Sequence, residues 1–153
     1  GPIAPDGFSG RLVMAIASPA GKTKAAEVLG GAGAFHTLIH PSAVVAPSAR
    51  LGAGTIVAPF CMVSADARVG DLVLVNAYSS VGHDVGVGDR TTLSCHVDLT
   101  GRVRVGEACF FGSGARVIPG VEIGDGATIG AGAVVMRRAP PGATLYAAPA
   151  KRL

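Results

Sequence analysis

Histidines and cysteines are the side chains of this chain best suited to acid–base or nucleophilic chemistry. His83 is followed directly by Asp84, and a neighbouring carboxylate holds an imidazole and favours its protonated form once it has taken a proton. Gly101 stands further along, and a backbone N–H with no side chain beside it can approach a ligand carbonyl. If the fold repeats with the spacing from His83 to Gly101, these two residues lie side by side. They then predict a general base next to a backbone amide donor. The alternative is an ordinary turn exposed to solvent.

A six-residue repeat supplies that spacing. From Ile39 to Val134 the sequence divides into 16 hexads without insertion, such as VGHDVG, VGDRTT and LTGRVR, and His83 and Gly101 are three hexads apart. The first position is Ile, Leu or Val in 15 hexads, with Phe111 as the exception, and the fifth position is always a small residue or Val. Such regularity is the signature of a solenoid.

Side-chain alternation gives the repeat a geometry. The fifth, sixth and next first residues form a short strand that points in, out and in, while the second to fourth residues form a turn in which glycine permits the conformation. Three hexads then make one coil of a slim triangular prism, so residues three hexads apart stack. His83 and Gly101 share one corner, and Asn76 lies one corner earlier.

The two ends depart from the repeat. Residues 11–17 predict a buried strand and Lys22–Leu29 a short helix ended by Gly30 and Gly31. We therefore expect three parts: a strand–helix remnant with a linker over 1–38, the β-helix over 39–135, and a basic, proline-rich loop and tail over 136–153.

Composition excludes several classes of protein. The chain has 153 residues, 23 of them glycine, with a net charge of +3 and no basic block, which argues against nucleic-acid binding. No apolar run is long enough to span a bilayer, so no membrane insertion is expected. Three cysteines, an odd number, indicate reduced thiols and a cytoplasmic location.

Metal and cysteine chemistry are weak alternatives. A zinc hydratase built on such a prism needs two further histidines five apart after the first, and no histidine follows His96. Cys61 and Cys109 occupy inward fifth positions, and Cys95 has no histidine or lysine at its own corner one coil away. We therefore predict no metal site and no acyl-enzyme.

The segments NAYSSVGHDVGVGD (76–89), LTG (99–101), IHPSA (39–43) and APAKR (148–152) resemble the sialic acid O-acetyltransferase and bacillosamine N-acetyltransferase family. The resemblance implies a left-handed parallel β-helix, acetyl-CoA as co-substrate, a sugar acceptor of the nucleotide-linked kind, and a homotrimer with its clefts between prisms.

The same resemblance assigns roles to residues. It implies that His83 is the general base, with Asp84 as its acidic neighbour, and that the Gly101 amide donates a hydrogen bond to the acetyl carbonyl. It also places Asn76 in the active site. Coenzyme A then follows the corner column and ends near the tail, and the residues implied in its binding are Ser113, Ala131 and Lys151.

Two features depart from the family. Many members carry a second histidine nine residues after the base, where this chain has Thr92, and members begin with a nucleotide-sugar domain of which only the last strand and helix match here. The sequence therefore predicts a sugar N- or O-acetyltransferase that works by direct transfer. The alternative is a truncated, weakly active or non-catalytic scaffold.

Overall fold

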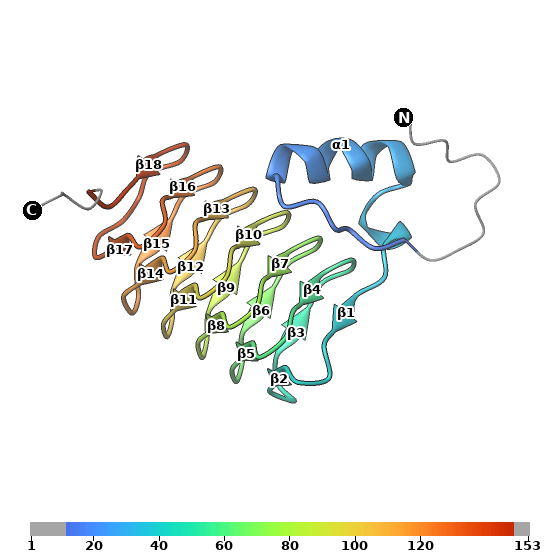
Figure 1. Cartoon of the computed structure of the whole chain (residues 1–153), viewed down its shortest axis with the longest axis horizontal. Helices are drawn as coiled ribbons and strands as arrows, with labels where there is room; N and C mark the ends of the chain where they lie inside the picture. Colours follow the sequence, from blue (N-terminus) through green and yellow to red (C-terminus); the bar gives the residue numbers. More distant parts are fainter. Residues whose placement is uncertain (1–11, 149–153) are drawn as a thin grey trace, which may run out of the picture.

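The computed structural model describes residues 12–148. Within them the chain is mainly β and forms a left-handed parallel β-helix, as the hexads and the family resemblance together predict. Helix α1 (Pro19–Leu29) and the 3₁₀ helix η1 (Ala32–Ala34) precede it. The coils stack along one axis, and α1 lies along the side of the stack (Figure 1).

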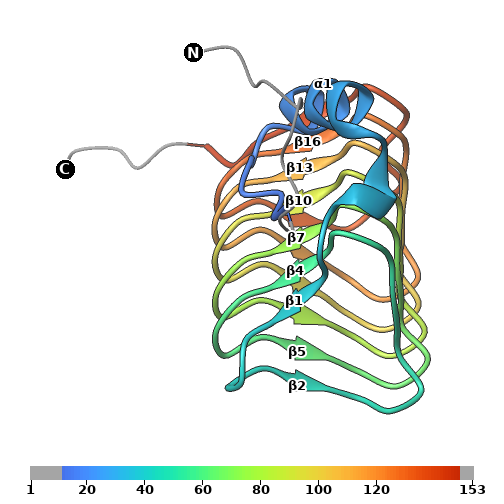
Figure 2. The same ribbon diagram turned by 90° about the vertical axis from the view of Figure 1, so that its right-hand side faces the viewer.

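Three parallel sheets form the sides of the prism over residues 12–148 (Figure 2). The first sheet contains β1 (Leu38–Ile39), β4 (Ile56–Val57), β7 (Leu74–Val75), β10 (Thr92–Leu93), β13 (Phe110–Phe111), β16 (Thr128–Ile129) and β18 (Thr144–Leu145). The second contains β2 (Val44–Val45), β5 (Met62–Val63), β8 (Ser80–Val81), β11 (Asp98–Leu99), β14 (Arg116–Val117) and β17 (Val134–Val135). The third contains β3 (Arg50–Leu51), β6 (Arg68–Val69), β9 (Gly86–Val87), β12 (Arg104–Val105) and β15 (Glu122–Ile123).

Each two-residue strand joins a sixth hexad position, which faces outward, to the next first position, which faces the core. Leu93 pairs with Phe111 in the following coil, and both are fully buried. Backbone bonds such as Ser94 N–H to Phe111 C=O, 2.9 Å, connect successive coils. The core is therefore a narrow column of Val, Leu, Ile and small residues, which explains how the chain folds with few aromatic side chains.

The turns use glycine differently from the prediction, which attributed the glycines to the backbone conformation of the turn. The left-handed residue stands at the fourth hexad position, where nine described non-glycine residues have φ between 52° and 62°. Glycine at the second position is required by crowding instead. A Cβ on Gly88 would lie 2.5 Å from the carbonyl carbon of Gly106 in the next coil. The second-position glycines therefore allow the close approach of coils rather than a special φ.

Three corner columns connect the sheets. The aromatic corner, from the first to the second sheet, carries Phe60, Tyr78 and His96. The histidine corner, from the second to the third sheet, carries His83 and Gly101. The acidic corner, from the third back to the first sheet, carries Asp71, Asp89, Glu107 and Asp125.

The N-terminal segment corrects two expectations. The strand expected over 11–17 is reduced to one bridge between Leu12 and Phe35, because the described part of the chain offers no other strand beside it. The helix starts at Pro19 rather than Lys22, since Ser18 caps it by accepting from Gly21 N–H at 3.3 Å. Its end at Gly30, with φ 93°, is as predicted.

A buried lysine attaches α1 to the prism. Lys22 is fully buried, and its Nζ donates to Thr91 C=O at 2.9 Å and to Thr92 Oγ1 at 2.7 Å. Burial lowers the pKa of Lys22 from 10.5 to about 7. Apolar contacts among Met14, Ala25 and Leu72 form a second, smaller core beneath the helix.

The C-terminal boundary was predicted wrongly. The β-helix does not stop at 135, because Ala139 pairs with Ile123 and β18 pairs with β16. The spacing between these partners is two residues shorter than three hexads, so one repeat is shortened. The hexad frame then resumes as APPGAT over 139–144.

Candidate active site

The histidine corner brings a histidine and a carboxylate into contact. His83 and Asp84 lie in the turn between β8 and β9, and their Nδ1 and Oδ2 atoms are 2.8 Å apart. Both side chains are about half exposed, 56% and 51%. Because an ionised carboxylate only accepts hydrogen bonds, Nδ1 carries the proton in the neutral ring and Nε2 carries the lone pair. The arrangement leaves Nε2 free to act as a base.

Gly101 lies one coil further along, directly against this ring. A Cβ at position 101 would overlap Nε2 of His83 and would lie 2.6 Å from its Cε1. Gly101 is buried, and among the described residues no acceptor lies on its N–H. The next residue in the column is Pro119, which has no side-chain acceptor to offer. A glycine is therefore needed here, because any side chain would meet the His83 ring.

Asn76 lies elsewhere on the described chain. It stands at the aromatic corner, at the opposite edge of the second sheet from His83, and its Oδ1 accepts from Ala77 N–H at 2.8 Å. Ser113 and Ala131 are exposed in the same corner column, and Cys95 is half-buried there. The structure therefore does not join these residues to His83 within one chain. Lys151 lies outside the described residues.

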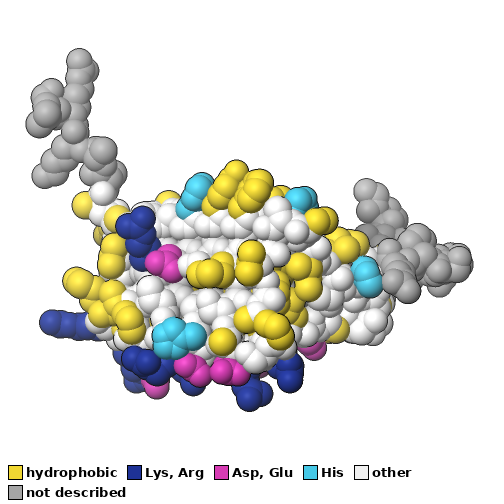
Figure 3. Space-filling model, turned by 90° about the horizontal axis from the view of Figure 1, so that it is seen from below, with side chains coloured by type: hydrophobic (Ala, Val, Ile, Leu, Met, Phe, Trp, Pro, Cys, Tyr) yellow, Lys and Arg dark blue, Asp and Glu magenta, His cyan; other side chains and the backbone are white. Residues whose placement is uncertain are grey.

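An aromatic stack at this corner was not predicted. The rings of Phe60 and Tyr78 are 5.1 Å apart and those of Tyr78 and His96 are 5.0 Å apart, nearly parallel. Phe60, Tyr78 and His96 are three hexads apart in the sequence, and this spacing could have predicted the stack. Figure 3 shows the consequence: hydrophobic and histidine side chains gather along one long edge of this face, and arginines, acids and a histidine along the other.

Thr92, at the position where many family members carry a second histidine, is buried. Its hydroxyl donates to Ala17 C=O at 2.6 Å and accepts from Lys22 at 2.7 Å. Thr92 therefore connects the N-terminal segment to β10 instead of facing an open cleft.

The cysteines and the remaining metal-ligating side chains form no second site in the described part of the chain. Burial raises the pKa of the Cys61 and Cys109 thiols, so both are poor nucleophiles. Over residues 12–148 no three His, Cys, Asp or Glu side chains cluster as a metal site would require. No helix in that range combines the length and apolar character needed to cross a membrane.

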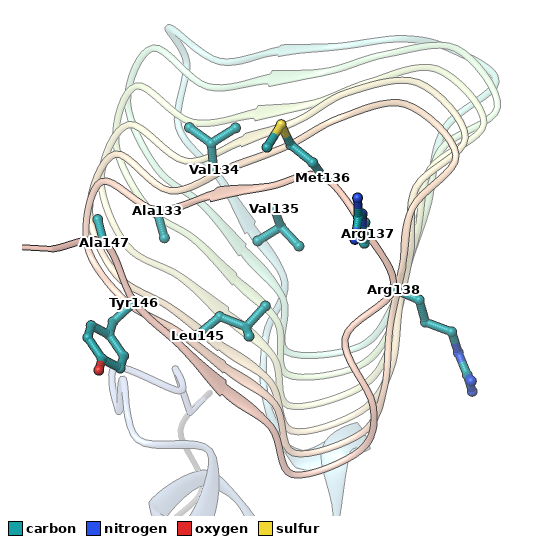
Figure 4. A pocket seen from close by; sticks show the side chains of 9 residues that line it. All are labelled: Ala133, Val134, Val135, Met136, Arg137, Arg138, Leu145, Tyr146 and Ala147. Atoms are coloured by element: carbon teal, nitrogen blue, oxygen red, sulfur yellow. The ribbon is translucent and has the colours of Figure 1, made fainter.

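The C-terminal end of the prism is open and bordered by basic residues. A hollow of about 470 Å³ is lined by the last strands, with Val135 and Leu145 pointing into it and Arg138 and Tyr146 pointing away (Figure 4). Arg138 Nε lies 3.5 Å from Glu122, and Arg137 is exposed. This end has the charge to receive an anionic group.

Comparisons with known proteins place this geometry in a family. Residues 102–137 match the model "Bacterial transferase hexapeptide (six repeats)". PerB from Caulobacter crescentus, solved with CoA and GDP-perosamine, is 40% identical over 90% of this chain and 67% of its own, with a TM-score of 0.81. The chain belongs to the hexapeptide-repeat sugar acetyltransferases. It is therefore an acyltransferase, as predicted from the sequence.

Two further matches agree with this family. The acetyltransferase domain of PglB from Neisseria gonorrhoeae FA1090 is 33% identical over 99% of this chain and 73% of its own, with a TM-score of 0.82. WeeI from Acinetobacter baumannii AYE is 27% identical over 91% of this chain and 68% of its own, with a TM-score of 0.76. No curated protein sequence matched the chain.

Proposed function

We propose that this sugar acetyltransferase moves an acetyl group from acetyl-CoA directly to an amino or hydroxyl group of a nucleotide-linked sugar, with His83 as the general base. One observation carries the proposal: the His83 ring lies directly against Gly101, and Asp84 holds its Nδ1 so that Nε2 is free. The ligands of PerB, CoA and GDP-perosamine, support the two substrates. So does a PglB domain solved with acetyl coenzyme A.

The chemistry follows from the positions of three groups. Nε2 of His83 takes the proton as the acceptor nitrogen or oxygen attacks the thioester carbonyl. The Asp84 carboxylate orients the ring and stabilises the imidazolium that forms. The Gly101 N–H donates to the oxyanion of the tetrahedral intermediate. The carbon–sulfur bond then breaks, and the coenzyme A thiolate leaves and is protonated. No metal ion and no acyl-enzyme enter these steps.

We place coenzyme A along the aromatic corner, past Ser113 and Ala131 toward Lys151, with Asn76 in the same cleft. Ser113, Ala131 and Asn76 lie across the second sheet from His83, so a second copy of the chain is needed to bring the two corners together. Exposed apolar side chains on this face support such a contact, and the largest are Val44, Phe60, Met62 and Tyr78. We therefore propose a homotrimer with its active sites between prisms. Three free cysteines are consistent with a cytoplasmic location.

Acetyl transfer is tested by measuring coenzyme A release with a thiol reagent in the presence of acetyl-CoA and nucleotide-linked 4-amino sugars. Release that depends on the amino sugar, that is retained in Cys95→Ser and that is lost in His83→Ala supports the proposal. Loss in Cys95→Ser with retention in His83→Ala indicates an acyl-cysteine and overturns direct transfer. Sedimentation at micromolar concentration tests the trimer separately.

A further inference from the structure

The carbonyl group of Asp84 differs from those at the equivalent turn positions. Over residues 12–148, no carbonyl at a fourth hexad position accepts a hydrogen bond from a backbone N–H. The Asp84 carbonyl instead accepts from Nη1 of Arg104, a side chain of the next coil, whose Nη1 also donates to Val103 C=O at 3.3 Å. Within the described chain, the other fourth-position carbonyl that accepts from a side chain is that of Arg90, which lies 3.4 Å from Lys22 Nζ. The peptide after Asp84 is therefore held from outside its own turn.

Arg104 packs across Gly86 on its way to this contact. Arg104 and Gly86 are register partners in neighbouring coils, at the outward position of the third sheet. A Cβ on Gly86 would lie 3.4 Å from Cδ and 3.9 Å from Nη1 of Arg104, so the arginine side chain lies across the glycine toward the histidine corner. Arg68 is the register partner on the other side of Gly86 and lines the same shallow groove of about 330 Å³. Its side chain makes no hydrogen bond or ion pair within the described residues.

The contact acts on the residue that orients the base. Asp84 has the left-handed backbone that recurs at the fourth hexad position, φ 59°, and its N–H donates to Ala65 C=O at 3.0 Å. Its carboxylate is fixed to His83 Nδ1 at 2.8 Å. A displacement of the Asp84 backbone would move the carboxylate and, with it, the imidazole ring.

We propose that Arg104 is a positioning residue for the acetyl transfer: it holds the Asp84 carbonyl and thereby keeps the Asp84 carboxylate on His83. Gly86 is the second component, because the arginine side chain lies across it and a side chain larger than a methyl group would enter that path. The inference rests on the proposed function, since it assumes that His83 is the base. Arg104 touches neither the acceptor nor the thioester in this role, so its effect must pass through Asp84.

A double-mutant cycle tests that dependence. Arg104→Met should lower kcat about 3- to 10-fold with KM for acetyl-CoA unchanged within about twofold, and Arg104→Lys should recover part of the loss. In an Asp84→Asn background, Arg104→Met should have no further effect, because the carboxylate it positions is already gone. Arg68→Met is the matched control, with wild-type kcat expected. Equal losses from Arg104→Met in both backgrounds, or a loss mainly in KM that indicates a direct ligand contact, overturn the inference.

Gly86→Val provides an independent variant that leaves Arg104 in place. Valine suits a strand, but its branches occupy the path of the arginine, so kcat should fall as in Arg104→Met and the two changes together should be no worse than either. Additive losses contradict the inference. The proposed function fails in a distinguishable way: His83→Ala and Asp84→Asn would then both retain full activity.

Discussion

The histidine corner and the acidic corner have the same backbone but use it for different purposes. At the acidic corner, a carboxylate in one coil accepts the N–H of a residue in the turn one coil earlier. Asp71 accepts from Ala53 N–H at 2.7 Å, and Asp89 accepts from Asp71 N–H at 2.8 Å. Asp125 repeats the contact with Glu107 N–H at 2.9 Å. These carboxylates therefore satisfy three backbone donors of the column and stabilise the stacking of coils.

At the histidine corner the same position lacks such a partner. Pro119 stands one coil beyond Gly101 and offers no carboxylate, so the Gly101 N–H has no acceptor among the described residues, and the His83 ring packs against the glycine. In the function proposed above, this corner therefore supplies a base, His83, and a donor, the Gly101 N–H. The comparison teaches that the same turn serves coil stacking where a carboxylate caps a backbone donor, and leaves a backbone N–H for a ligand where a histidine packs against a glycine.

Replacing His83 should cause the largest change in turnover. His83→Ala removes the base and should lower kcat by about 10²–10⁴-fold, while the affinity for coenzyme A stays nearly constant, because the ring acts on the acceptor. Steady-state kinetics and calorimetry measure the two quantities. Wild-type kcat in a correctly assembled variant would falsify the assignment of the base.

Gly101→Ala should rank second. The added Cβ occupies the position of Nε2 and must displace the ring, so we expect kcat to fall by about 10²-fold with little change in the melting temperature. The matched control is Glu107→Ala, the equivalent position at the acidic corner, which should leave kcat unaltered. Equal kcat losses in both variants would show that the two corners do not differ as described.

Asp89→Ala should reverse the pattern, with stability lost and turnover kept. The Asp71 N–H loses its carboxylate acceptor, at a cost of about 1–2 kcal/mol, or a few degrees in melting temperature. Thermal melts followed by circular dichroism measure this shift, and kcat below the melt should match that of the wild type. A loss of kcat without a change in melting temperature would contradict a purely structural acidic corner.

Lys22→Met should have the smallest effect on turnover and should appear as a change in the pH dependence of stability. Burial lowers the pKa of Lys22 to about 7, so between pH 7 and about 10 the unfolded chain binds a proton that the folded chain does not. Stability therefore rises with pH across this window, by on the order of 2–4 kcal/mol, and the full cost of burying the charge is present below pH 7. The variant should lose this rise in melts at pH 7, 8 and 9. Identical slopes in the two proteins would contradict a buried, titrating lysine.

The hexad frame by itself determined much of the fold and the centre of the site. A strict period of six specifies three sheets and the stacking of every third hexad, and this stacking is enough to place His83 against Gly101. The left hand and the coenzyme A column came from the resemblance to a family. The periodicity could not reveal the extra strand β18, because the shortened repeat after Val135 interrupts the frame.

The tertiary structure alone decided the features that depend on side chains from distant parts of the chain. A charged lysine is expected at the surface, and Lys22 is buried only because α1 packs on β10. Arg104 reaches the Asp84 carbonyl with its side chain lying across Gly86, its register partner in the neighbouring coil. A repeat determines how each coil stacks on the next. It does not determine which side chains from different segments meet on the outer surface of the stack.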